Sequence, residues 1–359
     1  MAYTDIDDST INFNTVTYTG NVDHSSANGS QAITGVGFQP DWVWIKPRTL
    51  GYSAGSHNLT DSVRGAGVGL FSDLNSAEYD YGTSANGGSV ITFGSDGFTL
   101  GGASQVNEDS NTYVAWNWKA GGSASSNTNG SITSTVSANT TAGFSIVSYT
   151  GTGSAATVGH GLGVAPSLYI VKNRSSAQAW RVFVSSLGAD KILRLSTTHA
   201  SSTDTSMWNN TSPTSSVFSI GTPAQVNTSG ENYIAYCFAD VKGYLKVGSY
   251  TGNGNADGPF VYTGFKPAWV LVKKTSEARE WMIWDNKRDS FNVSKAVLHP
   301  DNTAAEDSST SYEMIDILSN GFKLRQSDTD TNQSGGTFIY MAFAESPFVN
   351  SNGIPNNAR

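Results

Sequence analysis

The sequence predicts an all-β protein of three tandem antiparallel β-sandwich modules with a jelly-roll or lectin-like strand pattern. The first reason is an apolar segment that begins with Gly, passes through Pro and ends in Lys, at residues 37–46, 163–172 and 264–273. The second is that apolar runs are short, rich in aromatic and β-branched residues, and separated by Gly, Asn and Asp, without the sustained period of a helix. Such short strands, apolar on two sides, favour a sandwich over a barrel.

Two further markers recur around each apolar segment, so the repeating unit is longer than the segment itself. A Tyr-Thr-Gly turn precedes it, and an aromatic strand follows at residues 113–118, 233–238 and 338–343. The spacing from the proline to that strand is 73, 67 and 71 residues. Repetition of this kind indicates three variants of one supersecondary unit.

The repeats divide the chain into five parts. We expect module 1 with an N-terminal arm, a linker, modules 2 and 3, and a C-terminal tail, at residues 1–118, 119–142, 143–240, 241–345 and 346–359. The linker is predicted from its Gly, Ser, Thr and Asn content, although Ile132 and Val136 leave room for one edge strand. The joint between modules 2 and 3 is so short that these two modules should pack rigidly.

The first apolar segment shows how such a strand should be buried. Trp42 and Trp44 point to one face, and Val43 and Ile45 point to the other. A strand that is apolar on both faces is expected to be covered on both.

Composition and charge exclude several classes of function. The 359 residues carry a net charge of −8 with only 14% charged residues. No basic run could follow a phosphate backbone, so neither a nucleic acid nor an acidic membrane surface is an expected partner. The start of the chain has no signal-peptide pattern, and a single Cys excludes an internal disulfide framework, which fits folding in a reducing cytoplasm.

No catalytic residue, metal ligand set or cofactor site is predicted. The five histidines are scattered singly, which does not make a zinc site. Glycoside hydrolysis needs two carboxylates about 5–10 Å apart, and the sequence offers no way to pair the loose candidates. These candidates are Glu108, Asp109, Glu231 and Glu280.

An acid and a base three residues apart recur in modules 1 and 3, as Asp61 with Arg64 and as Asp285 with Arg288. Module 2 has Val184 and Gly188 there. A catalytic carboxylate is one interpretation, and a local ion pair across a turn is the favoured one.

The lysines that end the three apolar segments, Lys46, Lys172 and Lys273, have two interpretations. They could face an anionic ligand, or they could keep a strand edge soluble, and the second is favoured. Cys237 aligns with Asn117 and Ala342, which indicates a small residue on a partly covered face and no nucleophile.

Aromatic residues in the variable loops are the only binding-site candidates. Tyr79, Tyr81 and Trp208 could form a platform for a glycan or a protein partner, with simple loop packing as the alternative. Trp180 and Trp281 occupy matching places in two modules and are predicted to lie in the core.

Taken together, the markers resemble a β-rich repeat family of structural proteins in tailed bacteriophages, particularly marine phages of the type that infects cyanobacteria. The resemblance extends over nearly the whole chain. It is carried by MAYTDIDDST at the start, the Tyr-Thr-Gly turns, QPDWVWIKPR, the run from NTYVAWNWKAGG to SYTGTG, VGSYTGNGNADGPF, GFKPAWVLVKKT, IDILSNGFK and FAESPFVNSNGIPNNAR.

The resemblance implies a non-enzymatic structural protein on the virion surface, either a tail-fibre-like appendage or a capsid decoration. It implies contacts with other virion proteins, a homo-oligomer, and adhesion to the host surface as a further expectation. Two alternatives stay open: a lectin-like adhesin that binds a host surface glycan, and a glycanase that degrades host polysaccharide. Location on the head or on the tail is left open as well.

Overall fold

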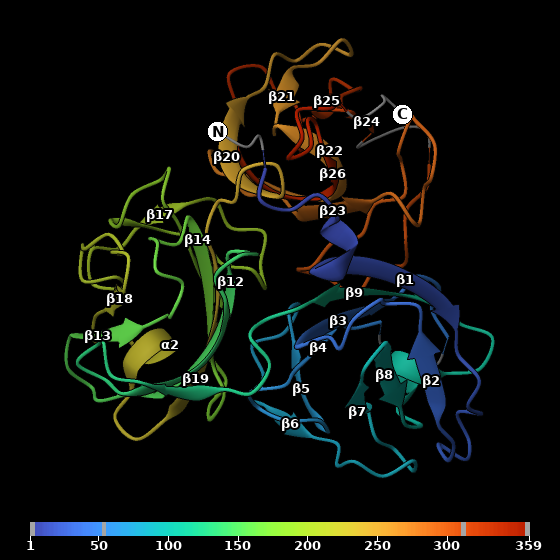
Figure 1. Ribbon diagram of the computed structural model, residues 1–359, viewed down its shortest axis with the longest axis vertical. Coiled ribbons are helices and arrows are strands. Elements are labelled where there is room, and N and C mark those ends of the chain that lie inside the picture. The colour runs from blue at the N-terminus through green and yellow to red at the C-terminus, as the bar shows by residue number, and fades with distance from the viewer. Residues whose placement is uncertain (1–3, 52–54, 310–313, 356–359) are drawn as a thin grey trace.

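The computed structural model describes residues 4–51, 55–309 and 314–355, and within them the chain forms three lobes around a common centre (Figure 1). Each lobe contains one large antiparallel sheet that faces the centre and smaller sheet structure outside it. We call the lobes modules 1, 2 and 3 in chain order.

Module 1 follows a short 3-10 helix, η1 (Ser9–Ile11), and includes the single-turn helix α1 (Ser104–Asn107). Its large sheet has the order β1-β9-β3-β4-β5-β6, and its small sheet has the order β2-β8-β7. The strands are β1 (Phe13–Thr19), β2 (Gln31–Thr34), β3 (Trp42–Pro47), β4 (Asn58–Asp61), β5 (Val68–Phe71), β6 (Tyr79–Asp80), β7 (Val90–Gly94), β8 (Gly97–Leu100) and β9 (Thr112–Trp118).

Module 2 has a large sheet of order β10-β11-β12-β19-β14-β15 and two small two-stranded sheets, β13-β18 and β16-β17. Its helix α2 (Ala224–Asn227) corresponds to α1. The strands are β10 (Ser125–Asn127), β11 (Ser134–Asn139), β12 (Phe144–Thr150), β13 (Ala156–Gly159), β14 (Leu168–Asn173), β15 (Arg181–Val184), β16 (Lys191–Ile192), β17 (Ser202–Thr203), β18 (Val217–Ile220) and β19 (Asn232–Phe238).

Module 3 has a four-stranded sheet of order β20-β26-β22-β23 and a small sheet of order β21-β25-β24. The strands are β20 (Leu245–Thr251), β21 (Phe260–Tyr262), β22 (Phe265–Lys274), β23 (Trp281–Asp285), β24 (Ile315–Leu318), β25 (Gly321–Leu324) and β26 (Thr337–Pro347). Every strand pair in the seven sheets is antiparallel, so the predicted all-β class is confirmed.

The predicted two-sided burial of the first apolar segment is confirmed as well. Val43 and Ile45 on β3 pack under the small sheet of module 1, in a cluster with Ile33 and Phe98. Trp42 and Trp44 point the other way, and both are fully buried, although no strand of their own module covers them. Something else must therefore cover the large sheet of module 1.

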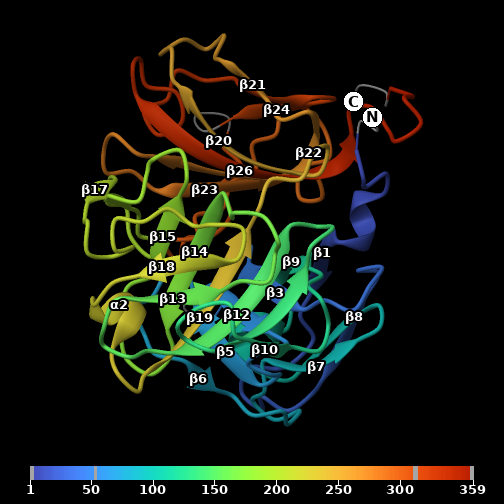
Figure 2. The ribbon, with the colours of Figure 1, turned by 60° about the vertical axis from the view of Figure 1, so that its left-hand side comes forward.

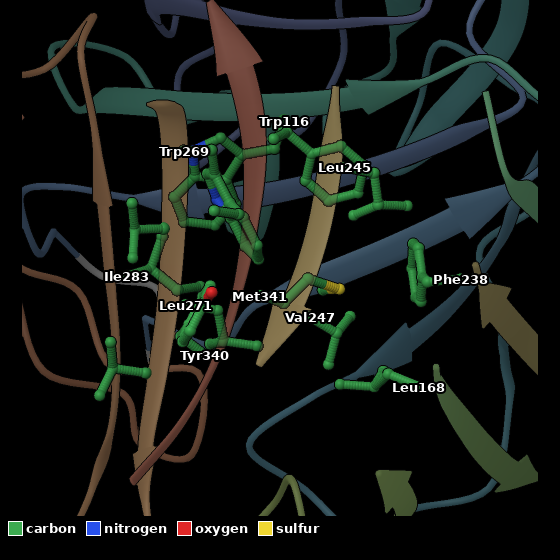
Figure 3. Packing of buried hydrophobic residues seen from close by; sticks show 14 of the residues in the cluster. Trp116, Leu168, Phe238, Leu245, Val247, Trp269, Leu271, Ile283, Tyr340 and Met341 are labelled. Carbon is green, nitrogen blue, oxygen red and sulfur yellow. The ribbon is translucent and has the colours of Figure 1, made fainter. Parts of the chain in front are cut away.

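That cover is supplied by the other two modules, because the inner faces of the three large sheets meet in one hydrophobic core. The indole of Trp42 stacks on Tyr236 of β19 at a centroid distance of 4.2 Å. Trp118 meets Trp269 of β22 edge to face at 5.8 Å. Figure 3 shows this shared core, with Leu168 and Phe238 of module 2 facing Leu245, Val247 and Met341 of module 3.

The segment predicted as a linker is a structured part of module 2, so that prediction is wrong. Strand β11 pairs with β12 over residues 135–139, and β10 pairs with β11. Val136 is buried against the outer core of the module, as its alternative assignment to an edge strand requires. Thr135 is exposed, whereas Ser134 and Ser137 are buried and donate to the Gly159 and Gly122 carbonyls at 2.9 and 2.8 Å.

The N-terminal arm (blue) and the C-terminal tail (red) approach each other beside module 3 (Figure 2). The backbone N–H of Ser351 in the tail donates to the Asp7 carboxylate at 2.7 Å. Thr4 reaches the Lys242 carbonyl at the joint between modules 2 and 3, with its hydroxyl donating at 3.0 Å. The tail therefore lies along the last module and the N-terminal arm.

Candidate functional site

Of the three predicted loop aromatics, Trp208 is not available to a ligand. Its side chain is fully buried and packs edge to face on Tyr169 at 4.9 Å and on Phe183 at 6.1 Å. Its indole N–H donates to the Lys191 carbonyl at 3.0 Å. The prediction of Trp208 as a binding residue is wrong, because the loop folds back and uses this indole to close the core of module 2.

The other two aromatics form a surface pair at the edge of module 1. Tyr79 lies on the short edge strand β6 and is 56% exposed. Its ring meets that of Tyr81 edge to face, with centroids 4.6 Å apart. The neighbouring Asp80 is exposed, and its carboxylate accepts from the Gly82 N–H at 2.8 Å. An exposed aromatic ring can bind the apolar face of a sugar, whereas Asp80, as the next residue of the strand, points to the opposite face.

Tyr81 holds this pair in place. A Cβ atom at Gly69 would lie 2.9 Å from the Tyr81 ring, so only glycine lets the ring lie flat on β5. Burial raises the pKa of Tyr81, and a hydrogen bond with the Asn58 side chain opposes that rise. Tyr81 is therefore a half-buried support, and Tyr79 is the residue that a partner would touch.

The scattered carboxylates do not come together. Glu108 and Asp109 lie in module 1, Glu231 in module 2 and Glu280 in module 3. Glu231 accepts from Asn173 at 2.6 Å, and that hydrogen bond lowers its pKa, against the effect of burial. Within the described ranges, no group of three or more His, Cys, Asp or Glu side chains could hold a metal ion.

The recurring Asp and Arg of module 1 pair locally, as predicted, and also reach into module 2. Arg64 Nε lies 2.5 Å from the Asp61 carboxylate, and both side chains are fully buried. Arg64 also bonds Glu78 at 3.0 Å, and Glu78 bonds Arg174 of module 2 at 2.8 Å. Asp61 accepts from the hydroxyl of Tyr236, also of module 2, at 2.8 Å. We call this set of five residues the 1–2 network.

The same arrangement joins module 3 to module 1. Arg288 Nε lies 2.5 Å from Asp285, and Arg288 bonds Glu306 at 2.9 Å. Glu306 bonds Arg48 of module 1 at 2.8 Å, and the indole N–H of Trp116 donates to Asp285 at 2.9 Å. Burial would raise the pKa of Asp285, but the Arg288 charge holds it below its ordinary value. We call this set the 3–1 network.

Among the residues that the structure describes, the interface between modules 2 and 3 has no such network. Val184 pairs with Leu168 as Asp61 pairs with Trp42, so Val184 takes the place of the aspartate. Counting from Val184, the arginine position falls on Leu187, which packs on the shared core, and not on Gly188 as the sequence comparison placed it. Two interfaces are thus closed by buried charges and the third by apolar side chains.

The three lysines at the strand ends are completely buried, so their predicted role at a soluble edge is wrong. Each shares the inward face of its strand with the core residues two and four positions before it. Lys172 donates to the Asn75 carbonyl of module 1 at 3.1 Å, and Lys273 donates to the Thr198 carbonyl of module 2 at 2.9 Å. Burial lowers the pKa of Lys172 to about 7 and that of Lys273 to about 8.

One more set of hydrogen bonds joins the modules, and in each case a module donates to the module before it in the ring. Trp180 of module 2 donates to the Phe71 carbonyl of module 1 at 2.8 Å, and Trp281 of module 3 donates to the Arg194 carbonyl of module 2 at 2.8 Å. Both indoles are fully buried, which confirms their predicted place in the core.

His57 occupies the corresponding position in module 1. Its Nδ1 accepts from Trp44, so Nε2 carries the proton and donates to the carbonyl of His299 in module 3 at 2.9 Å. Burial holds the pKa of His57 well below its ordinary value, which keeps the ring neutral in this role.

Sequence reasoning missed three buried asparagines that fix the Tyr-Thr-Gly turns. The side-chain carbonyl of each accepts the N–H of the residue after that turn, at 3.1, 2.7 and 2.8 Å, and each amide donates to further backbone carbonyls. The signal was present, because each lies six residues before the first aromatic residue of the following strand. They are Asn107, Asn227 and Asn332.

The single cysteine behaves as a core residue. Cys237 is fully buried on β19, among the residues between the two sheet layers of module 2. Burial raises the pKa of its thiol, which disfavours the reactive thiolate. The predicted absence of a nucleophile role agrees with this environment, although the face it lies on is fully covered and not partly covered.

The geometry defines the class of protein as all-β, with antiparallel sheets packed as sandwiches. Repeated polar residues form hydrogen bonds and ion pairs between its modules. Residues 8–347 match the family model of a domain of unknown function, DUF7483, and the chain belongs to that family. This one domain spans all three modules, as expected if they share a core. No curated protein matches the chain. Neither of the described α-helices, each of four residues, is long and apolar enough to cross a bilayer.

Proposed function

We propose that this chain is a structural protein on the surface of a tailed bacteriophage particle, where it makes contacts with other virion proteins as an appendage or as a capsid decoration. The proposal starts from the resemblance of the repeat markers to phage structural proteins. One structural observation supports it most: the polar and aromatic residues that recur in the modules fix turns, or form hydrogen bonds and ion pairs between modules. The residues that recur in the three modules hold them together as one rigid body. A protein that is built into a virus particle has to be rigid.

The test is to label the protein on purified particles with a specific antibody and to image them by electron microscopy. Label on the head supports decoration, and label on the tail supports an appendage. Particles that carry no label, while the same antibody detects the protein elsewhere in infected cells, contradict the proposal.

A second candidate function is adhesion to a host surface glycan through Tyr79. The exposed ring and its support by Tyr81 favour this function over catalysis. The cost to stability of losing an exposed ring is small, so binding and folding can be separated at this position.

Tyr79→Ala should abolish binding on a glycan array while changing the free energy of unfolding by less than about 0.5 kcal/mol. Tyr262→Ala is the matched control, because Tyr262 is an equally exposed tyrosine, at 60%, on an edge strand of module 3. No glycan bound by the native chain, or equal loss in both variants, counts against Tyr79 as the adhesion site. Release of soluble products from host polysaccharide would instead favour a glycanase.

A further inference from the structure

The three modules differ at one edge of their large sheets. In module 2, the hairpin of β10 and β11 covers the free edge of β12. The equivalent strands β1 and β20 begin at Phe13 and Leu245, which align with Phe144 at the start of β12 through their partners on the central strand. Within the described chain, β1 pairs only with β9 and β20 pairs only with β26. Modules 1 and 3 therefore each have an open strand edge.

In module 2 the covering strand places its apolar side chains over a glycine. A Cβ atom at Gly161 would lie 3.0 Å from Val136 and 3.2 Å from Ala138, both on β11. Gly161 follows Val158 by three residues, and Val158 pairs with Phe218 in the small sheet.

Module 3 has a cavity of about 480 Å³ at the corresponding place. Gly264 follows Val261 by three residues, and Val261 pairs with Phe322, so Gly264 is the counterpart of Gly161. Both glycines have positive φ, of 73° and 85°. The cavity is lined mainly by apolar and aromatic residues, among them Val241, Leu245, Tyr262, Gly264, Phe348 and Val349.

The edge of β20 is free only toward its C-terminal end, because residues 240 and 241 occupy its start. The first turn closes part of the edge, because Leu245 exchanges both backbone hydrogen bonds with Val241, and the Val247 N–H donates to Asp240 at 3.0 Å. Ser249 and Thr251 lie beyond, and both are exposed. The backbone hydrogen bonds between β20 and β26 are formed by even-numbered residues of β20. The backbone groups of Ser249 and Thr251 therefore point away from β26.

We propose that the open edge of β20 binds an extended segment of a partner protein, which adds to the sheet antiparallel to β20 as β11 adds to β12. The segment should carry a small apolar side chain opposite Gly248, which is the counterpart of the Val147 that Val136 faces, so that this side chain lies beside Gly264. This interaction is independent of the proposed function. Main-chain pairing supplies affinity in such complexes, and the pocket for alternate side chains supplies specificity.

Two observations favour β20 and an outside partner. On β1 the bonded groups lie on both sides of Thr17, because Asn14 accepts the Thr15 N–H at 3.0 Å and Gln31 donates to the Thr19 carbonyl at 2.9 Å, whereas those of β20 lie together at its start. A second copy cannot donate its own β11, because that strand is already paired on both sides, with β10 and β12.

The experiment uses the full chain and a fluorescent synthetic peptide with the sequence of residues 131–142, which contains β11. Fluorescence anisotropy should show saturable binding, and a scrambled peptide should not bind. Ser249→Pro removes an N–H that faces away from the sheet, a position where an edge strand tolerates proline, and should weaken binding at least tenfold. Ser249→Ala keeps the N–H and should bind as the native chain does.

Thr17→Pro, at the corresponding position of β1, should leave binding unchanged. Failure of the native chain to bind the peptide, or equal binding by Ser249→Pro, overturns the proposal. If Ser249→Pro does not fold, hydrogen exchange of the native chain decides: protection of residues 247–251 by the peptide supports the proposal, and protection elsewhere overturns it. Dimers of the native chain that pair through β20 would identify a second copy as the occupant and overturn it too.

Discussion

Modules 1 and 3 present a charged face to the next module in the ring, whereas module 2 presents an apolar one. The charged faces hold the Asp61 and Arg64 pair and the Asp285 and Arg288 pair, each with no exposed side-chain surface. At the corresponding position module 2 has Val184, and the partner position on β26 is Met341. The same backbone geometry therefore accepts two different chemistries at its joints.

Features that all three interfaces share are needed by the fold, and features found at some of them are additions to a particular interface. All three interfaces keep a hydrogen bond from an indole or imidazole N–H to a carbonyl of the neighbouring module, and all three bury a lysine at a strand end. In the described part of the chain, only two carry an ion network. Buried ion pairs are weak evidence for stability, since apolar replacements of similar volume can be as stable. We infer that the networks specify which modules are neighbours, and that apolar packing holds the ring together.

The largest expected effect comes from breaking one network on one side only. Arg64→Leu leaves the Asp61 carboxylate buried beside Tyr236 without its cation, and should lower the free energy of unfolding by about 3–5 kcal/mol. Denaturant unfolding measures this. Arg288→Leu should behave in the same way at the interface of modules 3 and 1.

The matched control replaces the ion pair of module 1 by the apolar side chains that module 2 has at these positions. Asp61→Val combined with Arg64→Leu removes both charges, so it should be clearly more stable than Arg64→Leu alone. If the double variant is as unstable as the single one, the two interface chemistries are not interchangeable.

An intermediate effect is expected inside the modules, where all three are alike. Asn332→Ala leaves the Asn253 N–H and the Gln326 carbonyl without their partner, and should cost about 1–3 kcal/mol. Asn107→Ala and Asn227→Ala should cost similar amounts. Unequal costs, measured by the same unfolding curves, would show that the modules differ in their turns as well as in their interfaces.

The smallest effect concerns the lysine that lacks a carboxylate. Lys46 and Lys273 lie near Asp73 and Asp301, whereas burial alone shifts the pKa of Lys172. The pKa of Lys172, about 7, is below its unfolded value, so the unfolded chain binds more protons between pH 7 and about 10. This group therefore makes the native chain more stable as the pH rises through that range.

Lys172→Met should flatten this part of the stability profile and cost less than about 1.5 kcal/mol at pH 10, where the native amine is neutral. Lys273→Met serves as the comparison, because it leaves Asp301 buried and unpaired and should destabilise the protein at pH 7. Unfolding curves across the pH range measure both. An unchanged slope in Lys172→Met would mean that its amine stays charged in the folded protein.

The sequence was sufficient to predict the fold class, because strand period and turn residues are local properties. It also predicted that β3 is buried on both faces, from the alternation of Trp42 and Trp44 with Val43 and Ile45. It could not predict what covers Trp42 and Trp44, because the cover comes from residues more than a hundred positions away. The shared core therefore depends on tertiary contacts between the repeats and not on a local sequence pattern.

The errors have the same origin. Strand β11 has the composition of a linker and becomes a strand because β12 offers it an edge. Trp208 lies in a variable loop, and only the fold shows that its ring closes the core against Tyr169. For the candidate site, sequence found the exposed Tyr79, but the support from Gly69 and Tyr81 depends on the register of β5 and β6.

The central claim is that one shared core makes the three modules a single folding unit, and calorimetry of the native chain tests it most directly. The account predicts one thermal transition whose calorimetric enthalpy equals its van't Hoff enthalpy, with Arg64→Leu shifting the whole transition to lower temperature. Two or three resolved transitions, with Arg64→Leu shifting only one of them, would contradict it.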